Sequence, residues 1–318
     1  MPKKKSLTLQ RVLVLLLAYI MLAVCGGVAA SVLFVPGVVG ANKAAKAVIP
    51  SLKVENVDFD VTSLPQKSTM YARDGSTVIA TFYNQNRIVV PLKKISKTMQ
   101  QAVVAREDRR FWTHAGVDVQ GVMRAFVQTY LVKGSQQGGS SLTQQYVKNV
   151  LLMQAIEDDD SIAQYHATED TIARKIREML ISVQMEKKYS KAEILQGYLN
   201  IAQFGNNLYG VETAAQRYFS VSAADLNVVQ SATIAAITKN PSLYDPLVEE
   251  NQKESENQRN IVLKLMVQEG YITQDQYTEA VNTPLKDTLK VQDVNVGCQD
   301  TGDYAYFCDF VVHRIQNS

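Results

Sequence analysis

The stretch TMQQAVVAREDRRFWTHAG, residues 98–116, joins a helical pattern to a dense group of polar and aromatic residues. Met99, Ala102, Val103 and Arg106 recur at the spacing of one helix face, which predicts a helix that runs into the EDRRF segment. That segment sets two acids beside two arginines, an aromatic pair, a histidine and a glycine. Such a group of polar residues at the end of a helix marks a candidate site as well as an element boundary.

The chain after this segment repeats the helical pattern, so we predict a mainly α fold. The predicted helices lie within residues 122–132, 169–189, 191–200, 226–237 and 258–270. Their expected boundary residues are Ser190 with Glu193, Ser222 with Asp225, Gly270, and Thr273 at the start of a short successor. The acidic stretch 156–170 is expected to be a solvated loop. The apolar stripe of 122–132 is either core, the preferred interpretation, or a surface that dips into lipid.

A small β element is expected before the helices. Strand-like runs flank Asp74 and Gly75, a strong two-residue turn signal. This pattern predicts an N-terminal β-hairpin.

An uncharged run separates Arg11 from Lys43 and exceeds the about 20 apolar residues that a helix needs to cross a bilayer. A cleaved signal peptide is the alternative, but its apolar core would be only about 7–15 residues long. We therefore predict a single-pass transmembrane anchor at 12–40 in the cell membrane. The basic tail 1–11 is expected in the cytoplasm, and the chain from a linker at 41–66 onward is expected to be extracytoplasmic.

The composition outside the anchor limits the partners and the redox compartment. The formal charge of the chain is +2, and residues 1–42 hold four positive side chains and no acid, so residues 43–318 carry −2. An ectodomain so near neutrality offers no general field for nucleic acid, and no such partner is expected. In an oxidising compartment Cys298 and Cys308 are predicted to form a disulfide.

Three further stretches concentrate polar groups, namely GGSSLTQQYVKN (138–149), RKIRE (174–178) and KKYSKAEILQGYLN (187–200). Each has a structural explanation: Ser141 can cap a helix, Lys148 can extend to solvent, and Arg174 with Glu178 can form an i,i+4 pair. In the functional alternative, the Gly-Gly turn approaches a ligand closely while Ser141, Thr143, Gln144 and Gln145 donate to its oxygens. Glu178 is then a half-buried carboxylate compensated by a cation. The residues alone leave both alternatives open.

Together the four stretches resemble the glycosyltransferase domain of class A penicillin-binding proteins, the family 51 peptidoglycan glycosyltransferases. Residues 107–116 match E-D-x-x-F-x-x-H-x-G, and residues 138–145 match G-G-S-T-x-T-Q-Q with Ser141 in place of threonine. Residues 174–178 match R-K-x-x-E, and residues 191–200 match K-x-x-I-L-x-x-Y-L-N. The acidic stretch 156–170 departs from the family because it is longer than usual.

The resemblance implies a lysozyme-like, two-lobed helical domain at residues 67–290, pressed against the outer leaflet. Residues 291–318 are then expected to start a linker toward a transpeptidase domain that is not encoded in this chain. The implied reaction joins lipid II into β-1,4 glycan strands, releases undecaprenyl pyrophosphate and inverts the anomeric carbon. The implied partners are lipid II, the growing glycan strand, the membrane bilayer and other cell-wall synthesis proteins.

Glu107 is the implied general base, because a positioned carboxylate that takes the proton of a sugar hydroxyl is worth about 10²–10⁴-fold in rate. Asp108 is expected to bind substrate or, together with Arg109 and Arg110, to orient that base. Phe111 and His114 would shape the sugar site, although a structural hydrogen bond is the preferred role for His114.

The leaving pyrophosphate is expected to meet cations and hydrogen-bond donors. The residues assigned to it are Lys148, Arg174 and Lys175 as cations and Ser141 and Gln145 as donors, while Glu178, the second catalytic residue, holds the cations or assists at the donor sugar. A divalent cation, Mg²⁺ or Mn²⁺, on the pyrophosphate is compatible with this scheme. No metal site or other cofactor is assigned, because no acidic or histidine cluster has metal-ligand spacing.

Two other functions compete with this one. A lysozyme-like hydrolase that cleaves peptidoglycan also uses two carboxylates, but it has no pyrophosphate for Lys148, Arg174 and Lys175 to bind. A catalytically inactive membrane scaffold would be expected to lose its key acids, whereas Glu107 and Glu178 are both present.

Overall fold

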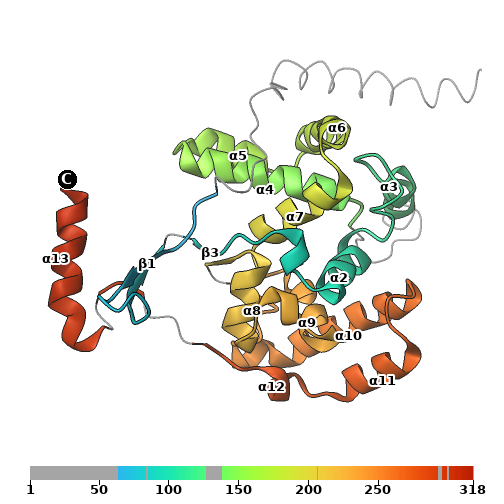
Figure 1. The fold of residues 1–318 in the computed structure, drawn as a ribbon. Coiled ribbons are helices and arrows are strands. Elements are labelled where there is room, and N and C mark those ends of the chain that lie inside the picture. Colours follow the sequence, from blue (N-terminus) through green and yellow to red (C-terminus); the bar gives the residue numbers. More distant parts are fainter. Residues whose placement is uncertain are drawn as a thin grey trace, which may run out of the picture. The chain divides into compact units, whose positions relative to one another are not determined.

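The computed structural model describes residues 64–83, 85–126, 138–205, 207–292, 296–298 and 301–317, and this part of the chain is mainly α-helical, as predicted (Figure 1). The helices are α2 (Lys97–Glu107), α3 (Val119–Phe126), α4 (Leu142–Glu157), α5 (Ser161–Thr168), α6 (Ile172–Lys188), α7 (Lys191–Ile201), α8 (Val211–Phe219), α9 (Val228–Ile237), α10 (Gln252–Gln268), α11 (Gln274–Asn282), α12 (Leu285–Thr288) and α13 (Ala305–Gln316). The strands are β1 (Ser68–Tyr71), β2 (Val78–Phe82), β3 (Asn86–Arg87) and β4 (Leu208–Tyr209).

The chain divides into two compact units, residues 1–53 with 170–177 and residues 54–169 with 178–318. Of the first unit, the structure describes only 170–177, which includes the first turns of α6. The predicted basic tail 1–11, the predicted anchor 12–40 and most of the predicted linker 41–66 lie outside the described residues. Within the described ranges, no helix is both long enough and apolar enough to cross a membrane.

Helix α9 is the centre of the core in the second unit. Every residue from Ser231 to Ile237 is buried, and α9 packs against α10 and α2, which lie beside it in Figure 1. The small side chains of Ala232, Ala235 and Ala236 are fully buried, which lets neighbouring helices approach closely. This packing brings the C-terminal end of α9 to the C-terminal end of α2, where the polar EDRRF segment begins.

Two local predictions are wrong, because one helix cap was not recognised and another was assigned to the wrong residue. The acidic stretch 156–170 is not a loop throughout, because the Asp160 side chain accepts from the backbone N–H groups of Ile162 and Ala163 and starts α5. Ser222 caps only a short 3₁₀ turn at Ala223–Asp225. Helix α9 starts later, where Asn227 and Gln230 form a capping box.

The other predicted helix boundaries are confirmed, but the preferred interpretation of the apolar stripe at 122–132 as core is not. Ser190 with Glu193 forms a capping box at the start of α7, Thr273 caps α11, and Gly270 follows α10 with a positive φ of 70°. In the apolar stripe predicted at 122–132, however, the Met123 side chain is 59% exposed. The core interpretation is therefore wrong for Met123, and residues 127–132 lie outside the described ranges.

The predicted hairpin is confirmed as the antiparallel pair β1 and β2. Its turn is held by Asp74, whose carboxylate accepts hydrogen bonds from the backbone N–H groups of Ser76 and Thr77 and from the Thr77 hydroxyl. These hydrogen bonds, led by the Thr77 hydroxyl, lower the pKa of Asp74 to about 2. Gly75 takes the positive φ of 70° that the turn requires.

A second, parallel pair of short strands, β3 with β4, was not predicted. Arg87 of β3 is fully buried and donates to the carbonyl oxygens of Asn200 and Pro65. The guanidinium also lies 5.2 Å from the centre of the Tyr209 ring. Burial lowers the pKa of Arg87 to about 10. Hydrogen bonding to two carbonyls and the ring contact explain how a buried guanidinium is tolerated.

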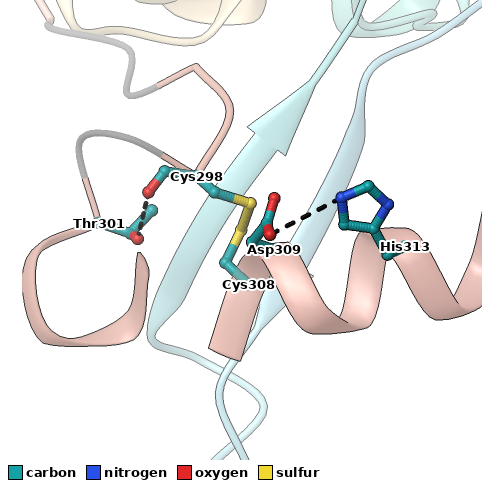
Figure 2. Close-up of a disulfide and its surroundings, with 5 residues drawn as sticks. All are labelled: Cys298, Thr301, Cys308, Asp309 and His313. Carbon is teal, nitrogen blue, oxygen red and sulfur yellow. Dashed lines mark hydrogen bonds and ion pairs between the residues drawn. A yellow bond between two sulfur atoms is a disulfide. The ribbon is translucent and has the colours of Figure 1, made fainter. Parts of the chain in front are cut away.

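The C-terminal residues return to the hairpin. Val296 forms a parallel bridge with Thr81 of β2, and the backbone N–H of Gly297 donates to the Thr81 carbonyl at 2.9 Å. The predicted disulfide between Cys298 and Cys308 is present (Figure 2). Buried Cys308 packs with Ile79 and Ala80 of β2, so α13 and the hairpin share a small core of their own. That residues 291–318 lead toward a transpeptidase domain stays a prediction.

The disulfide is expected to hold α13 on the hairpin and to contribute little to the helical core. Because the bond closes a loop with a sequence separation of 10, its loss should lower the free energy of unfolding of the part that contains α13 and the hairpin by roughly 2–3 kcal/mol. In Cys298→Ala, amide hydrogen exchange of Ile79 and Ala80 should speed up strongly, while that of Ala235 in α9 stays slow. This role would be contradicted if the amide hydrogen exchange rates of Ile79 and Ala80 stayed unchanged both in the variant and in wild-type protein whose disulfide has been reduced.

Candidate active site

Glu107 is the last residue of α2, and its half-buried carboxylate is held from two sides. The Gln145 side-chain amide, from α4, donates to Oε2 at 2.6 Å. The Thr238 hydroxyl, directly after α9, donates to Oε1 at 2.6 Å. Three helix segments far apart in the sequence therefore converge on one carboxylate.

The orientation of the Gln145 amide is set by a buried tyrosine. The Tyr198 hydroxyl, from α7, lies 3.4 Å from Gln145 Oε1 and can donate to it. Burial raises the pKa of Tyr198 well above 10, with the charge of Glu107 as the second cause, so the phenol keeps its proton. Because the amide oxygen faces the phenol, its NH₂ group must face Glu107.

Asp108 has different partners from Glu107 and joins α2 to the start of α4. It is the C-cap of α2 and is 6% exposed. Its Oδ2 accepts from the Leu142 backbone N–H at 2.9 Å and contacts His114 Nε2 at 2.7 Å. These contacts join Asp108 to Leu142 and His114 and not to Glu107, so orientation of the base by Asp108 stays a prediction, whereas the contacts of His114 match the structural hydrogen bond preferred for it. A direct contact of Asp108 with substrate stays a prediction.

The two arginines of the opening segment do not orient Glu107 in the way that the sequence suggested. Arg109 pairs with Glu269 at 3.6 Å. Arg110 pairs with Asp118 and also donates to the Gln120 side chain. The groups seen to hold Glu107 are instead Gln145 and Thr238.

Phe111 is fully buried, and a polar network covers its ring. The Lys191 ammonium lies 4.6 Å from the ring centre, 2.7 Å from Glu186 Oε1 and 3.5 Å from His114 Nδ1. With Lys191 as a donor at Nδ1, His114 carries its proton on Nε2 and donates it to Asp108. The Thr143 hydroxyl, on α4, donates to Glu186 at 2.5 Å. The network thus joins α4, α6 and α7 behind Phe111.

Ser141 serves the protein fold in this structure. Its hydroxyl accepts from the Gln144 backbone N–H in a capping box at the start of α4. Its one proton is donated to the Gly116 carbonyl at 2.6 Å. The capping alternative therefore describes the side chain as it is placed, and donation to pyrophosphate stays a prediction that requires the hydroxyl to turn.

Gly116 connects the Glu107 segment to the part of α6 that carries Glu178. Glu178 is 2% exposed, and its carbonyl oxygen accepts from the Ser182 hydroxyl at 2.7 Å. A Cβ on Gly116 would lie 2.7 Å from backbone atoms of Ser182, so only glycine permits this approach. The segments of the two predicted catalytic acids are thus in contact through Gly116.

The predicted cations are placed on two helices. Lys148 is partly exposed and lies one turn after Gln145 on α4, while Arg174 and Lys175 lie in the first turn of α6. Arg174 is 3.9 Å from the Asp170 carboxylate. Because residues 170–177 belong to the other compact unit, a shared pyrophosphate site for these cations stays a prediction.

Four site residues were missed or left without a role by the sequence analysis, namely Thr238, Tyr198, Glu186 and Lys191. They stand in helices or directly after one, and no spacing rule connects them to Glu107.

Within the described residues, no group of three or more histidine, cysteine, aspartate and glutamate side chains is arranged to hold a metal ion.

Comparison with known proteins gives a consistent result. The family model described as Transglycosylase matches residues 75–267. The chain is 39% identical over 233 residues to Penicillin-binding protein 4 of Bacillus subtilis (strain 168), covering 73% of this chain and 35% of that protein. It is 38% identical over 221 residues to Penicillin-binding protein 1A of Aquifex aeolicus (strain VF5), covering 70% and 28%. The chain thus spans about a third of the length of these relatives.

A solved structure also aligns with the chain. Penicillin-Binding Protein 1A from Haemophilus influenzae gives a TM-score of 0.41 and 22% sequence identity, covering 80% of this chain and 24% of that chain.

Replacement of Gly116 by alanine should disrupt the close contact between the Glu107 segment and α6 and destabilise the protein. The residue has a φ of 83° and no room for a Cβ, so Gly116→Ala should lower the free energy of unfolding by about 3 kcal/mol. Gly75→Ala is the matched control, because Gly75 has a φ of 70° and nothing within 4 Å of an added Cβ. It should cost only about 1 kcal/mol. Equal losses in denaturant titrations of the two variants would refute the close approach.

Proposed function

The chain belongs to the transglycosylase family, the peptidoglycan glycosyltransferases of class A penicillin-binding proteins, and on this premise we propose that it polymerises lipid II into β-1,4 glycan strands. The observation that carries this proposal is the fixed Glu107 carboxylate, which receives a donor from α4 and another from α9. Both donors are neutral. They hold the carboxylate in one orientation.

In the proposed reaction Glu107 takes the proton from the 4-hydroxyl of the acceptor sugar. That oxygen forms a bond to the anomeric carbon of the donor sugar, from the face opposite the leaving group, so the anomeric configuration inverts. The bond from the anomeric carbon to the pyrophosphate oxygen breaks, and its electron pair leaves with undecaprenyl pyrophosphate. Proton transfer to a carboxylate held in place is worth about 10²–10⁴-fold in rate.

Lys148, Arg174 and Lys175 are assigned to stabilise the negative charge that grows on the leaving group. Gln145 is fixed by Tyr198 and Glu107, so we assign it to the positioning of the base as well as to the neighbourhood of the substrate. Glu178, buried on α6, is proposed to hold the cations or to assist at the donor sugar. A Mg²⁺ or Mn²⁺ ion on the pyrophosphate would arrive as part of the substrate complex.

The proposal includes a location in the cell. Residues 12–40 are assigned as a single membrane anchor with residues 1–11 in the cytoplasm, because of the long uncharged run and the basic residues before it. The catalytic part then lies on the extracytoplasmic side, where lipid II, the growing strand, the membrane bilayer and other cell-wall synthesis proteins are the proposed partners.

Glu107→Gln should abolish strand synthesis, with at least about a 100-fold loss in initial rate, because an amide cannot take the hydroxyl proton. The measurement is the size distribution of products from labelled lipid II and the detergent-solubilised full chain, with folding checked by circular dichroism. Glu254→Gln is the matched control, since Glu254 lies on α10, where its carboxylate accepts hydrogen bonds from Asn257 and Gln258 and is not in contact with Glu107 in the described structure.

Strand synthesis by the Glu107→Gln variant at the wild-type rate would remove Glu107 as the base. The same assay separates the competing functions. A hydrolase would shorten preformed glycan strands and leave lipid II unconsumed, and an inactive scaffold would do neither.

A further inference from the structure

Thr238 is brought to Glu107 by α9, a helix that is largely buried. Helix α9 is buried at every position from Ser231 to Ile237, so its end is fixed by the core packing. Thr238 follows as the C-cap, with helical backbone angles (φ −52°, ψ −31°). Its side chain therefore has a fixed starting point next to the proposed base.

The Thr238 hydroxyl has two acceptors for one proton. Its Oγ1 lies 2.6 Å from Glu107 Oε1 and 2.8 Å from the carbonyl oxygen of Ala235. The Ala235 carbonyl is one of the last of α9 and has no partner further along a helix that ends there. Rotation about one bond thus moves the Thr238 proton between a carboxylate and a helix carbonyl, and in the second position Oγ1 is free to accept.

The other partner of Glu107 cannot change direction in this way. The Gln145 NH₂ group faces Oε2, and its oxygen faces the Tyr198 hydroxyl. An amide NH₂ only donates, so a proton on Oε2 would be directed at another N–H. A proton gained by Glu107 is therefore best accommodated at Oε1, where Thr238 can accept it.

We infer that Thr238 is a positioning residue whose hydroxyl keeps Glu107 hydrogen-bonded both before and after proton transfer. With Glu107 ionised, Thr238 donates to Oε1. Once Glu107 has taken a proton on Oε1, its O–H donates to Thr238 Oγ1, and the Thr238 proton turns to Ala235. The inference rests on the proposed function, because it concerns the base of that reaction.

The other ionisable groups around Glu107 have defined positions. On α2, the Arg106 guanidinium donates to Gln258 of α10 at 2.9 Å, and Asp108 bonds to Leu142 and His114. Tyr198 of α7 also lies within hydrogen-bonding reach of Thr238 and stays neutral. From α4, Lys148 lies one turn beyond Gln145. Thr238→Val removes the hydroxyl's contact with Tyr198 as well as its contact with Glu107, whereas Thr238→Ser keeps the hydroxyl, so the comparison of these two variants reports on the hydroxyl.

The test compares Thr238→Val with Thr238→Ser in full-length protein, by the initial rate of lipid II polymerisation as a function of pH. T238V removes the hydrogen bond to both forms of Glu107, but the bond to the ionised carboxylate is the stronger one. Its loss disfavours the charged form on balance, so the acidic limb of kcat/KM should move up by about one pH unit in T238V. T238S should restore the wild-type limb, because it keeps the hydroxyl. At pH values on the acidic side of the limb, the kcat/KM of T238V should be about tenfold lower than that of the wild type, because a shift of one pH unit corresponds to a tenfold difference there.

Thr233→Val is the control for the loss of a buried threonine hydroxyl from the same helix. Thr233 is fully buried and donates to the Val229 carbonyl at 2.9 Å. Its removal should leave the acidic limb where it is, even if the protein is less stable. If T238V does not fold, Thr238→Ala removes the same hydroxyl without a second methyl group and replaces it in the comparison.

A T238V or T238A limb that coincides with the wild type, or one that serine does not restore, would overturn the inference. If the wild type forms glycan strands in that experiment, the proposed function still stands even when the inference about Thr238 fails. A wild type that forms no strands would instead overturn the proposed function.

Discussion

Two adjacent carboxylates at the end of α2 must each find hydrogen-bond partners in different directions, and the site is built around that requirement. Asp108 turns to the first backbone N–H of α4 and to His114. Glu107 turns to Gln145 and Thr238. A buried carboxylate without donors would be costly, so α4 and α9 are constrained to bring their donors to one helix end. The position of the proposed base is a consequence of this packing.

The polar groups behind the site differ in how much they can change. Gln145 is fixed by Tyr198, and Lys191 has Glu186, His114 and the Phe111 ring as simultaneous partners. These groups favour one arrangement. Among the groups that hold Glu107, the Thr238 hydroxyl is the one with two acceptors at similar distances. A rigid surround with one group able to reorient suits a residue that must gain and lose a proton.

The sequence predicts the elements of this fold better than the contacts between them. Periodicity predicts α2, α6, α7 and α10, because each buries one face and the apolar spacing records that face. It does not identify α5, because Asp160 serves equally well as a helix cap or as a solvated loop residue. The Glu107 motif could be recognised from local spacing, whereas the Thr238 contact arises from tertiary packing over a sequence separation of 131. No local pattern carries that information.

The central claim is that Glu107 takes the proton of an acceptor hydroxyl, and the most direct measurement is a crystal structure with an unreactive lipid II analogue bound. The account predicts the 4-hydroxyl of the acceptor sugar within about 2.6–3.2 Å of a Glu107 carboxylate oxygen, with the Gln145 and Thr238 contacts preserved. An acceptor hydroxyl placed against another carboxylate, with Glu107 directed only into the protein, would contradict it.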